Sequence, residues 1–509
     1  MTGPAVLLLD AAGPESAALA RAAAARGQQV HAATAEAARR EPAAKLAGQV
    51  ITDFTRPDRA VEQIAAYARR HGVGAVLTVN EYLTELTSLV CAELGLPGND
   101  PHLAHAARDK AAMACVLAEA GVRIPYTRLA HDDGELHDAL RDRRVGFPCV
   151  IKPAAGASSA GVTVVTVLDE AAPAADAARS IHGTEGSEGG PGVIVQAYAA
   201  GTEYSVESVT QDGATTHLAI TRKATTSGPC RVETGHSLPV CLPPSTEAAV
   251  HRQVSTAIRA VGVRNGASHT EVVIDPAGRC AVIEIAARLG AGHIGTLLQH
   301  ALGIDVFAAL LDVALGRPAA LTPTARGHAT VRFITSPHTG RLTSLSRLPE
   351  QGPGVPFVPW RAAVGDLVHA ATANTDRLGC FVVTGSDADE VEERVDALAR
   401  QIQIQVQVEP LPAAGGPGRV RSGRRVRRPS PDSSRRPRPP CPAGAAPGAA
   451  RPGAGPHRSA TATARPASSP GCRRTPRTRY VRRSWPWPSG SSSQRPAPRT
   501  TRGRSPAPR

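Results

Sequence analysis

Two glutamates and one arginine in residues 269–293 have the types and the spacing of a site that handles phosphate. Glu271 and Glu284 each lie in a short apolar run, and the Pro-Ala-Gly-Arg turn between the runs predicts a β-hairpin. A carboxylate among apolar residues needs a cation, and Mg²⁺ is commonly held by one or two carboxylates together with nucleotide phosphates. Arg288 follows four residues after Glu284, where a guanidinium can meet phosphate charge. The alternative interpretation is an ordinary hairpin with both glutamates on exposed faces.

A second pattern that suits phosphate surrounds Lys152. Residues 147–153 predict a strand that ends on this lysine, and residues 154–162 form a loop of Gly, Ala and Ser. Backbone amides and hydroxyls bind phosphate oxygens, and a lysine adds a compact point charge. No GK[ST] follows the glycines, so the loop is not a P-loop, and a plain β-turn is the alternative. The chain has only four lysines: Lys45, Lys110, Lys152 and Lys223.

Charge divides the chain into two parts of opposite sign. Residues 412–509 contain 23 Arg, no Lys and one acidic residue, whereas residues 1–411 contain 35 basic and 43 acidic residues. The mildly acidic body disfavours nucleic-acid binding. The tail holds 20 of the 44 Pro and almost no Ile, Leu or Phe, which predicts disorder. Out-of-frame translation of GC-rich DNA would give the same composition.

Targeting signals and cysteine spacing bear on the compartment. The first residues lack the cationic segment and continuous apolar core of a signal peptide, and no run of about 18 apolar residues occurs. Seven of the nine Cys are scattered through residues 1–411 without CxxC or CxH spacing, which is typical of reduced thiols. We therefore expect a cytoplasmic protein that does not bind a membrane.

Strand and helix patterns divide the body into three predicted domains. Residues 1–100 alternate strands with helices, which predicts a parallel, Rossmann-like sheet. Their first turn is not GxGxxG, so this domain is expected to form a substrate wall and not a dinucleotide site. Residues 101–320 contain both phosphate patterns, and residues 326–410 form another α/β unit before the tail at 412–509.

The order of these pieces resembles the ATP-grasp superfamily, and within it the L-amino-acid ligase and carboxylate–amine ligase branch. The pieces are RDK (108–110), FPCVIKP (147–153), GASSAGV (156–162), IVQAYAAGTEYSVES (194–208), ETGHSLP (233–239), HTEVVID (269–275) and VIEIAARLGAGH (282–293). The resemblance covers about residues 5–408. It implies an α/β ATP-grasp fold with an N-terminal Rossmann-like domain and a small C-terminal α+β domain.

The resemblance also implies a nucleotide site. Two lysines would contact the phosphates of ATP, and the Gly/Ser loop would close over them. The backbone of one strand end would line the adenine, and a glutamate would bind the ribose. The residues assigned in this way are Lys110, Lys152, Gly156, Ser158, Ser159, Gly161, Gln196, Ala197, Tyr198 and Glu203.

Four further residues would carry the chemistry. Glu271 and Glu284 would hold Mg²⁺, with Mn²⁺ as a substitute, and Arg288 would stabilise an acyl phosphate. His236, in a predicted loop, would assist at the phosphate or at the substrate carboxylate. Family members often have Asn two residues after the second glutamate, whereas this chain has Ala286, which leaves the number of metal ions open.

The implied activity is ATP-dependent ligation of a carboxylate to an amine, with amino acids as the expected substrates. Residues 222–240 are expected to form a wall of the substrate site, and the loops 154–162 and 183–192 to form a lid. Because similar ligases are commonly dimeric, a homodimer is one expectation.

Two other functions compete with this one. The first is a bicarbonate-using enzyme similar to biotin carboxylase or carbamoyl-phosphate synthetase, although the chain has no biotin-carrier motif and no second ATP-grasp copy. The second is a nucleotide-binding protein without catalysis whose arginine-rich tail binds polyanions.

Overall fold

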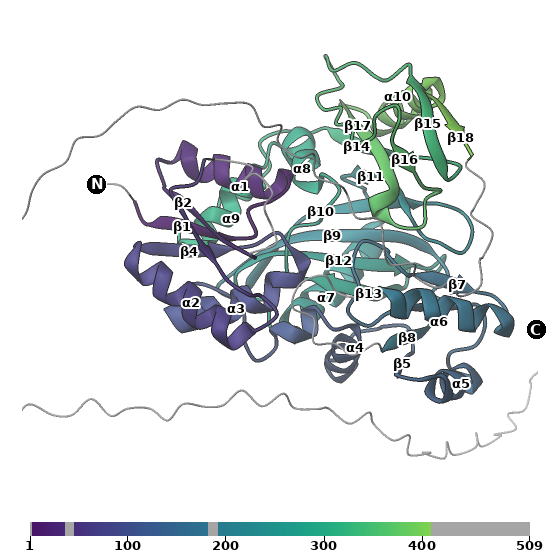
Figure 1. The fold of residues 1–509 in the computed structure, drawn as a ribbon, viewed down its shortest axis with the longest axis horizontal. Coiled ribbons are helices and arrows are strands. Elements are labelled where there is room, and N and C mark those ends of the chain that lie inside the picture. The colour runs from purple at the N-terminus through teal and green to yellow at the C-terminus, as the bar shows by residue number, and fades with distance from the viewer. Residues whose placement is uncertain (1–2, 36–44, 182–191, 409–509) are drawn as a thin grey trace, which may run out of the picture. The chain divides into compact units, whose positions relative to one another are not determined.

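Four sheets organise the part of the chain that the computed structural model describes, residues 3–35, 45–181 and 192–408 (Figure 1). The predicted tail at 412–509 lies outside the described residues. So does the predicted loop at 183–192, apart from Gly192.

The N-terminal sheet is parallel, as its alternating pattern predicts. Its strands have the order β3-β2-β1-β4, and β1 is buried along its whole length because helices cover the sheet. The elements are β1 (Ala5–Leu9), α1 (Pro14–Ala25), β2 (Val30–Thr34), β3 (Gly48–Ile51), α2 (Pro57–Arg70), β4 (Val73–Leu77), η1 (Glu81–Leu83) and α3 (Thr84–Leu94). The Rossmann-like winding is confirmed.

A four-stranded antiparallel sheet carries the Gly/Ser loop. Its order is β5-β8-β6-β7, and α5 and α6 pack on it around a core of small apolar side chains. This segment comprises η2 (Ala104–Ala107), α4 (Lys110–Glu119), β5 (Thr127–Ala130), α5 (Asp133–Arg141), β6 (Cys149–Pro153), β7 (Thr163–Val165), η3 (Leu168–Glu170), α6 (Ala171–Ser180) and β8 (Val193–Ala197).

A seven-stranded sheet forms the middle of the molecule, and all its neighbouring strands are antiparallel. In spatial order its strands are β13 (Cys280–Ala286), β12 (Gly266–Ile274), β9 (Thr202–Gln211), β10 (Ala214–Thr225), β11 (Glu233–Leu238), β14 (His328–Thr335) and β17 (Arg377–Gly385). The strands β14 and β17 come from the predicted C-terminal domain. That domain therefore shares backbone hydrogen bonds with the sheet that carries the predicted hairpin.

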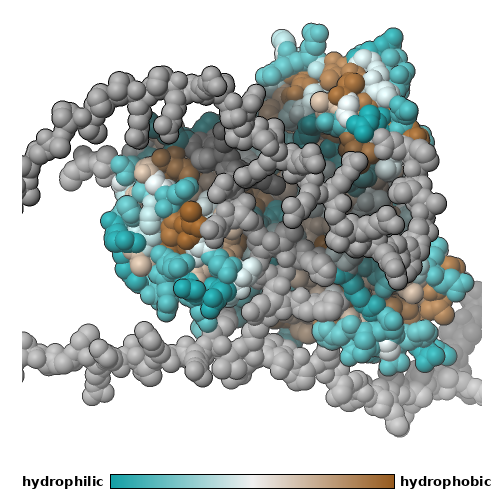
Figure 2. Space-filling model, viewed as in Figure 1, coloured by the Kyte–Doolittle hydropathy of each residue, from teal (hydrophilic) through white to brown (hydrophobic). Residues whose placement is uncertain are grey.

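The rest of the C-terminal part forms a three-stranded sheet and one helix. The sheet has the order β16-β15-β18, with β15 (Gly340–Ser346), β16 (Leu367–Val368) and β18 (Gln403–Gln407). The remaining elements are η4 (Asn374–Asp376) and α10 (Ala388–Gln401), which packs on β14 and β17. Figure 2 shows hydrophobic side chains among polar ones over this part of the surface, where Val364, Leu367 and Val408 are exposed.

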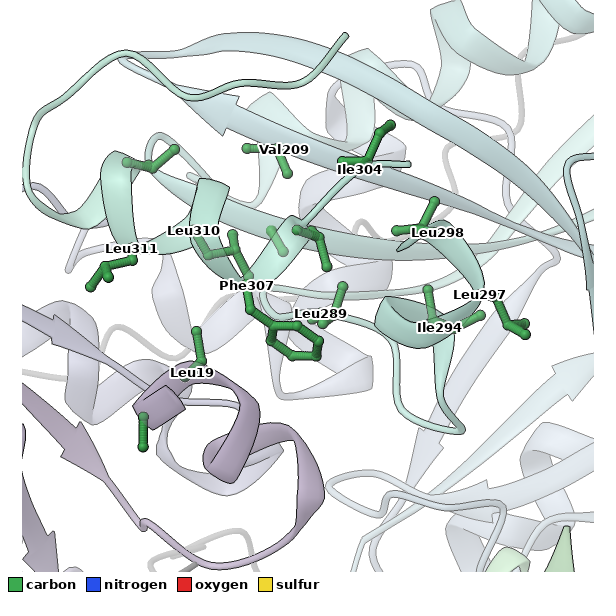
Figure 3. Close-up of a cluster of buried hydrophobic side chains, with 14 of the residues drawn as sticks. Leu19, Val209, Leu289, Ile294, Leu297, Leu298, Ile304, Phe307, Leu310 and Leu311 are labelled. Carbon is green, nitrogen blue, oxygen red and sulfur yellow. The ribbon is translucent and has the colours of Figure 1, made fainter. Parts of the chain in front are cut away.

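Two short apolar helices join the N-terminal domain to the seven-stranded sheet. One large hydrophobic cluster contains Leu19 of α1, Phe307 and Leu311 of α9 (Val306–Ala314), and Ile294 and Leu298 of α8 (Ile294–Leu302) (Figure 3). Burial of each such side chain stabilises the fold by roughly 1.5–3 kcal/mol. Helix α7 (Pro244–Ala260) packs against β13.

None of the described helices is long and apolar enough by itself to cross a membrane. The helices α8 and α9 meet the criterion only as a pair, and the pair is bent by 110°.

Candidate active site

The predicted hairpin is confirmed by β12 and β13. Glu271 and Glu284 lie directly opposite each other in the antiparallel register. Their side chains are 24% and 25% exposed, so both carboxylates remain accessible in a mostly buried environment. The exposed-face alternative for an ordinary hairpin is therefore wrong.

Both carboxylates face a cavity of about 720 Å³. It is bounded by the four-stranded antiparallel sheet (β5-β8-β6-β7), by the seven-stranded sheet, and by segments of the N-terminal and C-terminal parts. The predicted site residues that line it are Lys110, Lys152, Gly156, Ser158, Ser159, Gln196, Ala197, Tyr198, Glu203, His236, Glu271, Glu284 and Arg288. Gly161 does not line the cavity. An added Cβ there would lie 2.9 Å from Ile181, so this glycine serves packing against α6 and not the cavity wall.

Lys110 joins the Gly/Ser loop to the hairpin. Asp109 caps α4 by accepting hydrogen bonds from the amides of Ala111 and Ala112, and this fixes the start of the helix that carries the lysine. The Lys110 ammonium lies 2.9 Å from Glu284 Oε1 and donates to the carbonyl of Gly156 at 2.7 Å. The ammonium of Lys110 therefore contacts both predicted phosphate-binding elements, the hairpin and the Gly/Ser loop.

Lys152 is buried at the end of β6 and has a different environment. Within the described ranges, no carboxylate lies at ion-pair distance from its ammonium. Burial lowers the pKa of Lys152; Glu284 opposes this shift, and Lys110 adds to it. The charged form of this lysine is therefore under-compensated by the protein.

The Gly/Ser loop has an unusual backbone at its tip. Ser158 and Ser159 have φ angles of 59° and 57°, a region that residues with a side chain adopt rarely. The carbonyl of Ser158 accepts a hydrogen bond of 3.0 Å from the backbone amide of Asn374. A segment of the C-terminal part therefore holds the tip of this loop.

Lys223, on β10, is the centre of a cluster of carboxylates. Its ammonium lies 2.5 Å from Glu271 Oε1, 2.8 Å from Glu203 Oε1 and 3.1 Å from Glu233 Oε1. Burial alone would lower the pKa of Lys223, but these carboxylates raise it well above its usual range. Glu203, which the sequence assigns to the ribose of ATP, lines the cavity and also pairs with this lysine.

A buried histidine lies behind Glu271. His269 Nδ1 lies 2.9 Å from Glu207 Oε2, and His269 Nε2 lies 3.6 Å from Glu271 Oε1. Glu207 also accepts hydrogen bonds from the hydroxyls of Ser205 and Thr221. Burial would lower the pKa of His269, but Glu207 and then Glu271 raise it to about 10. The positively charged imidazolium of His269 therefore stabilises the Glu271 carboxylate.

His236 lies in a strand, so its predicted position in a loop is wrong. It is buried on β11, opposite Lys223 in the register, and its Nε2 lies 3.3 Å from Glu233 Oε2. Glu233 is held in turn by Arg377 at 2.9 Å and by Asn374 at 3.0 Å. A loop was predicted because the flanking Gly and Pro are typical of turns, whereas pairing with β10 and β14 makes this segment an interior strand.

Arg288 reaches toward the N-terminal domain. Its guanidinium pairs with Glu81, at the start of η1, and also donates to the carbonyl of Leu289 at 2.8 Å. Because Glu81 follows β4, the N-terminal domain contributes a charged side chain to the cavity wall.

Three family models match the chain. An ATP-grasp N-terminal domain matches residues 20–98, an ATP-grasp domain matches residues 145–297, and the L-amino acid ligase C-terminal domain 2 matches residues 332–407. The chain belongs to the ATP-grasp superfamily. The match over residues 332–407 is to a domain of the L-amino acid ligases.

Curated relatives and a solved structure agree with this assignment. The chain is 28% identical to carnosine synthase 1 of Gallus gallus over 282 residues, which are 53% of this chain and 30% of the relative. It is 29% identical to alanine–anticapsin ligase of Bacillus subtilis over 278 residues, 51% of this chain and 58% of that one. The chain thus spans less than two thirds of either relative.

The crystal structure of an L-amino acid ligase from Bacillus licheniformis has the same fold. Its TM-score is 0.67 at 20% identity, and the match covers 80% of this chain and 100% of that chain. The α/β ATP-grasp fold predicted from the sequence is therefore confirmed.

The donor set of this ATP-grasp chain fits a divalent cation. Glu271 and Glu284 present two hard oxygen donors from adjacent strands to one cavity. Each uses its Oε1 to contact a lysine, and within the described ranges no hydrogen bond is formed to the Oε2 of either carboxylate. Ala286 adds no donor. Two carboxylate oxygens completed by phosphate oxygens and water would satisfy Mg²⁺.

Several charged residues of this ATP-grasp site have no clear signal in the sequence. Lys223 carried a weak signal, because lysine is rare in the chain. Glu207 and Glu233 were embedded in strands without any spacing that points to a partner. Glu81 and Arg377 come from domains to which no charged contact with the cavity had been assigned.

Proposed function

We propose that this chain is an ATP-dependent carboxylate–amine ligase that joins two amino acids through an acyl phosphate and releases ADP and phosphate. The observation that carries the proposal is the pair Glu271 and Glu284, opposite each other on one cavity wall within reach of Lys110. The matches to L-amino acid ligase and to two amino-acid-joining relatives support the choice of substrates.

The proposed reaction has two steps. A carboxylate oxygen of the first amino acid attacks the γ-phosphorus of ATP, and the bond to the β,γ-bridging oxygen breaks to release ADP. The amine of the second amino acid then attacks the acyl carbon, the bond from this carbon to the phosphate oxygen breaks, and the ammonium proton is lost to solvent. Positioning and charge stabilisation are the main tasks of the protein in such a transfer.

The residues of this chain would divide these tasks. Lys152, which has no carboxylate at ion-pair distance among the described residues, would bind a phosphate oxygen, and Lys110 would shift from Glu284 toward the nucleotide. Gly156, Ser158 and Ser159 would cover the phosphates and exclude the water that hydrolyses an acyl phosphate.

Other residues would position the nucleotide and the acyl group. The backbone of Gln196, Ala197 and Tyr198 would line the adenine, and Glu203 the ribose. Arg288 and His236 would stabilise the acyl phosphate and the substrate carboxylate. Mg²⁺ held by Glu271 and Glu284 would neutralise phosphate charge.

Two further expectations remain part of this proposal. The supply of ATP and amino acids points to the cytoplasm, and a homodimer is the expected assembly. The competing bicarbonate reaction is less well supported because the C-terminal match is to an L-amino acid ligase domain.

The experiment is an assay of ADP release with Mg-ATP and pairs of amino acids, with the amide product detected by mass spectrometry. We expect ADP release that requires two amino acids, and its loss in Glu284→Ala. Bicarbonate-dependent ADP release without amino acids would favour the carboxylase-like alternative. Full amino-acid-dependent turnover by Glu284→Ala would contradict the metal assignment.

A further inference from the structure

One part of the cavity wall, which we call the ring-lined end, carries aromatic rings. Phe333 comes from β14, Phe357 from the segment before β16, and His293 from the residue before α8. The rings of His293 and Phe357 are 4.9 Å apart in an edge-on arrangement, and those of His236 and Phe333 are 5.4 Å apart. Parts of the chain that are distant in sequence thus place their rings around one space.

Two titratable groups of this ring-lined end are neutral at pH 7. Burial and then the charge of Arg361 lower the pKa of His293 to about 4, so its ring is neutral. Burial raises the pKa of the Cys380 thiol to about 12, Arg361 and Arg377 oppose this shift, and Glu15 adds to it. A neutral imidazole and a neutral thiol complete an apolar wall.

The charged side chains on this part of the cavity wall fall into two classes. Arg377 already has partners within the protein. It pairs with Glu233 at 2.9 Å, and its guanidinium lies over the Phe333 ring at 3.7 Å from the ring centroid. Arg288 likewise has a partner, because it forms an ion pair with Glu81. Arg361 and Glu15 also line the cavity, and neither side chain has a hydrogen-bond or ion-pair partner among the described residues.

We infer that this end of the cavity binds an amino acid whose side chain is aromatic or a large aliphatic group. The rings of Phe333, Phe357 and His293 would take the side chain, because ring–ring and ring–aliphatic contacts bury apolar area in a defined geometry. The carboxylate and ammonium of an amino acid match the guanidinium of Arg361 and the carboxylate of Glu15. The inference rests on the proposed ligase function and names the class of one of its two substrates.

The test is a matrix of ADP-release assays with Mg-ATP and all pairs of L-phenylalanine, L-leucine, glycine and L-aspartate. Pairs that contain phenylalanine or leucine should have a kcat/KM at least about 10-fold higher than pairs made only of glycine and aspartate. Equal or better turnover with the small and acidic pairs would overturn the inference and leave the ligase function intact. If no pair releases ADP, both the ligase function and the inference fail.

Variants at the rings locate the effect. Phe357→Ala should raise the KM for phenylalanine about 10-fold or more and leave the KM for ATP and for glycine unchanged. Phe147→Ala is the matched control, because Phe147 is exposed and lies outside the cavity wall. Phe357→Leu, which keeps an apolar side chain of similar size, should retain turnover with leucine better than with phenylalanine.

The remaining outcomes are equally decisive. Arg361→Met should raise the KM of the same amino acid about 10-fold whichever apolar side chain it carries. If Phe357→Ala and Phe357→Leu both behave as the Phe147→Ala control does, the ring-lined end does not bind substrate and the inference is wrong.

Discussion

The four-stranded and the seven-stranded sheets each bury one lysine on the cavity wall, and the two lysines have opposite environments. Lys223, on the seven-stranded sheet, contacts three carboxylates, and its pKa is raised well above its usual range. Lys152, on the four-stranded sheet, has no carboxylate at ion-pair distance within the described ranges, and burial lowers its pKa. The same residue type is satisfied in one sheet and under-compensated in the other.

This difference indicates that Lys223 is a structural cation and that Lys152 is available to bind a ligand. A buried charge costs stability unless other charges compensate it, and protein carboxylates supply this compensation at Lys223. At Lys152 the carboxylates of the protein compensate the charge only in part, and the phosphates of a nucleotide would complete the compensation. The four-stranded sheet is therefore the part that gains most from nucleotide binding.

The largest expected effect is on stability, in Lys223→Met. Three partly buried carboxylates would lose their shared cation, so we expect the free energy of unfolding to fall by about 3–5 kcal/mol. Urea-induced unfolding at pH 7 measures this, with the exposed Lys45→Met as a control that changes it by less than about 0.5 kcal/mol. A Lys223→Met protein as stable as the parent chain would end the distinction between the two lysines.

Lys152→Met should separate stability from activity. The free energy of unfolding should rise by roughly 1 kcal/mol because an under-compensated buried charge is removed. ADP release should fall on the order of 10²–10³-fold, because a charge that meets the transferred phosphate is lost. A destabilisation as large as that of Lys223→Met would show that Lys152 is structural as well.

The support of Glu271 by His269 should appear in metal affinity. In the presence of ADP, His269→Ala should weaken Mn²⁺ binding about 10–100-fold by electron paramagnetic resonance, because an orienting partner of a ligating carboxylate is lost. His269→Gln, which keeps an N–H donor, should retain part of the affinity. Affinity for ADP without metal should not change; if it falls as much as the metal affinity, the role of His269 is general.

The smallest effect concerns a histidine outside the cavity. His217 meets the hydroxyls of Ser208 and Ser255 at 2.8 Å each, and burial followed by the charge of His251 lowers its pKa to about 4. Because the folded pKa lies below the unfolded value, this group costs no stability above pH 6.5 and destabilises the fold as pH falls from 6.5 to 4.

A pH series of unfolding measurements checks this sign. Between pH 6.5 and pH 4, His217→Gln should lose about 2 kcal/mol less stability than the parent chain. The exposed His137→Gln serves as the control and should follow the parent chain. A pH dependence shared by all three proteins would assign the acid lability elsewhere.

Features encoded by local pattern could be predicted from the sequence. The hairpin of Glu271 and Glu284 follows from two apolar runs around a turn, and the parallel N-terminal sheet follows from alternating strands and helices. The strand that ends on Lys152 is equally local. In each case the pattern lies within the elements themselves and their order along the chain, so no tertiary contact is needed to predict it.

Features created by long-range strand pairing could not be predicted from the sequence. Lys223 gathers Glu203, Glu233 and Glu271 because β10 lies next to β9 and β11 and close to β12, and no spacing in the sequence states this order. The strand of His236 has a turn-like composition and becomes a strand only because β10 and β14 flank it. The ring-lined end draws on segments that only the assembled sheet brings together.

The central claim, that Glu271 and Glu284 hold a divalent ion against bound nucleotide, has a direct test. ADP is titrated calorimetrically into the parent chain and into Glu271→Gln/Glu284→Gln, each with and without Mg²⁺. We predict that Mg²⁺ tightens ADP binding by at least about 10-fold in the parent chain and has little effect in the double variant. ADP affinity that is indifferent to Mg²⁺ in the parent chain would contradict the account.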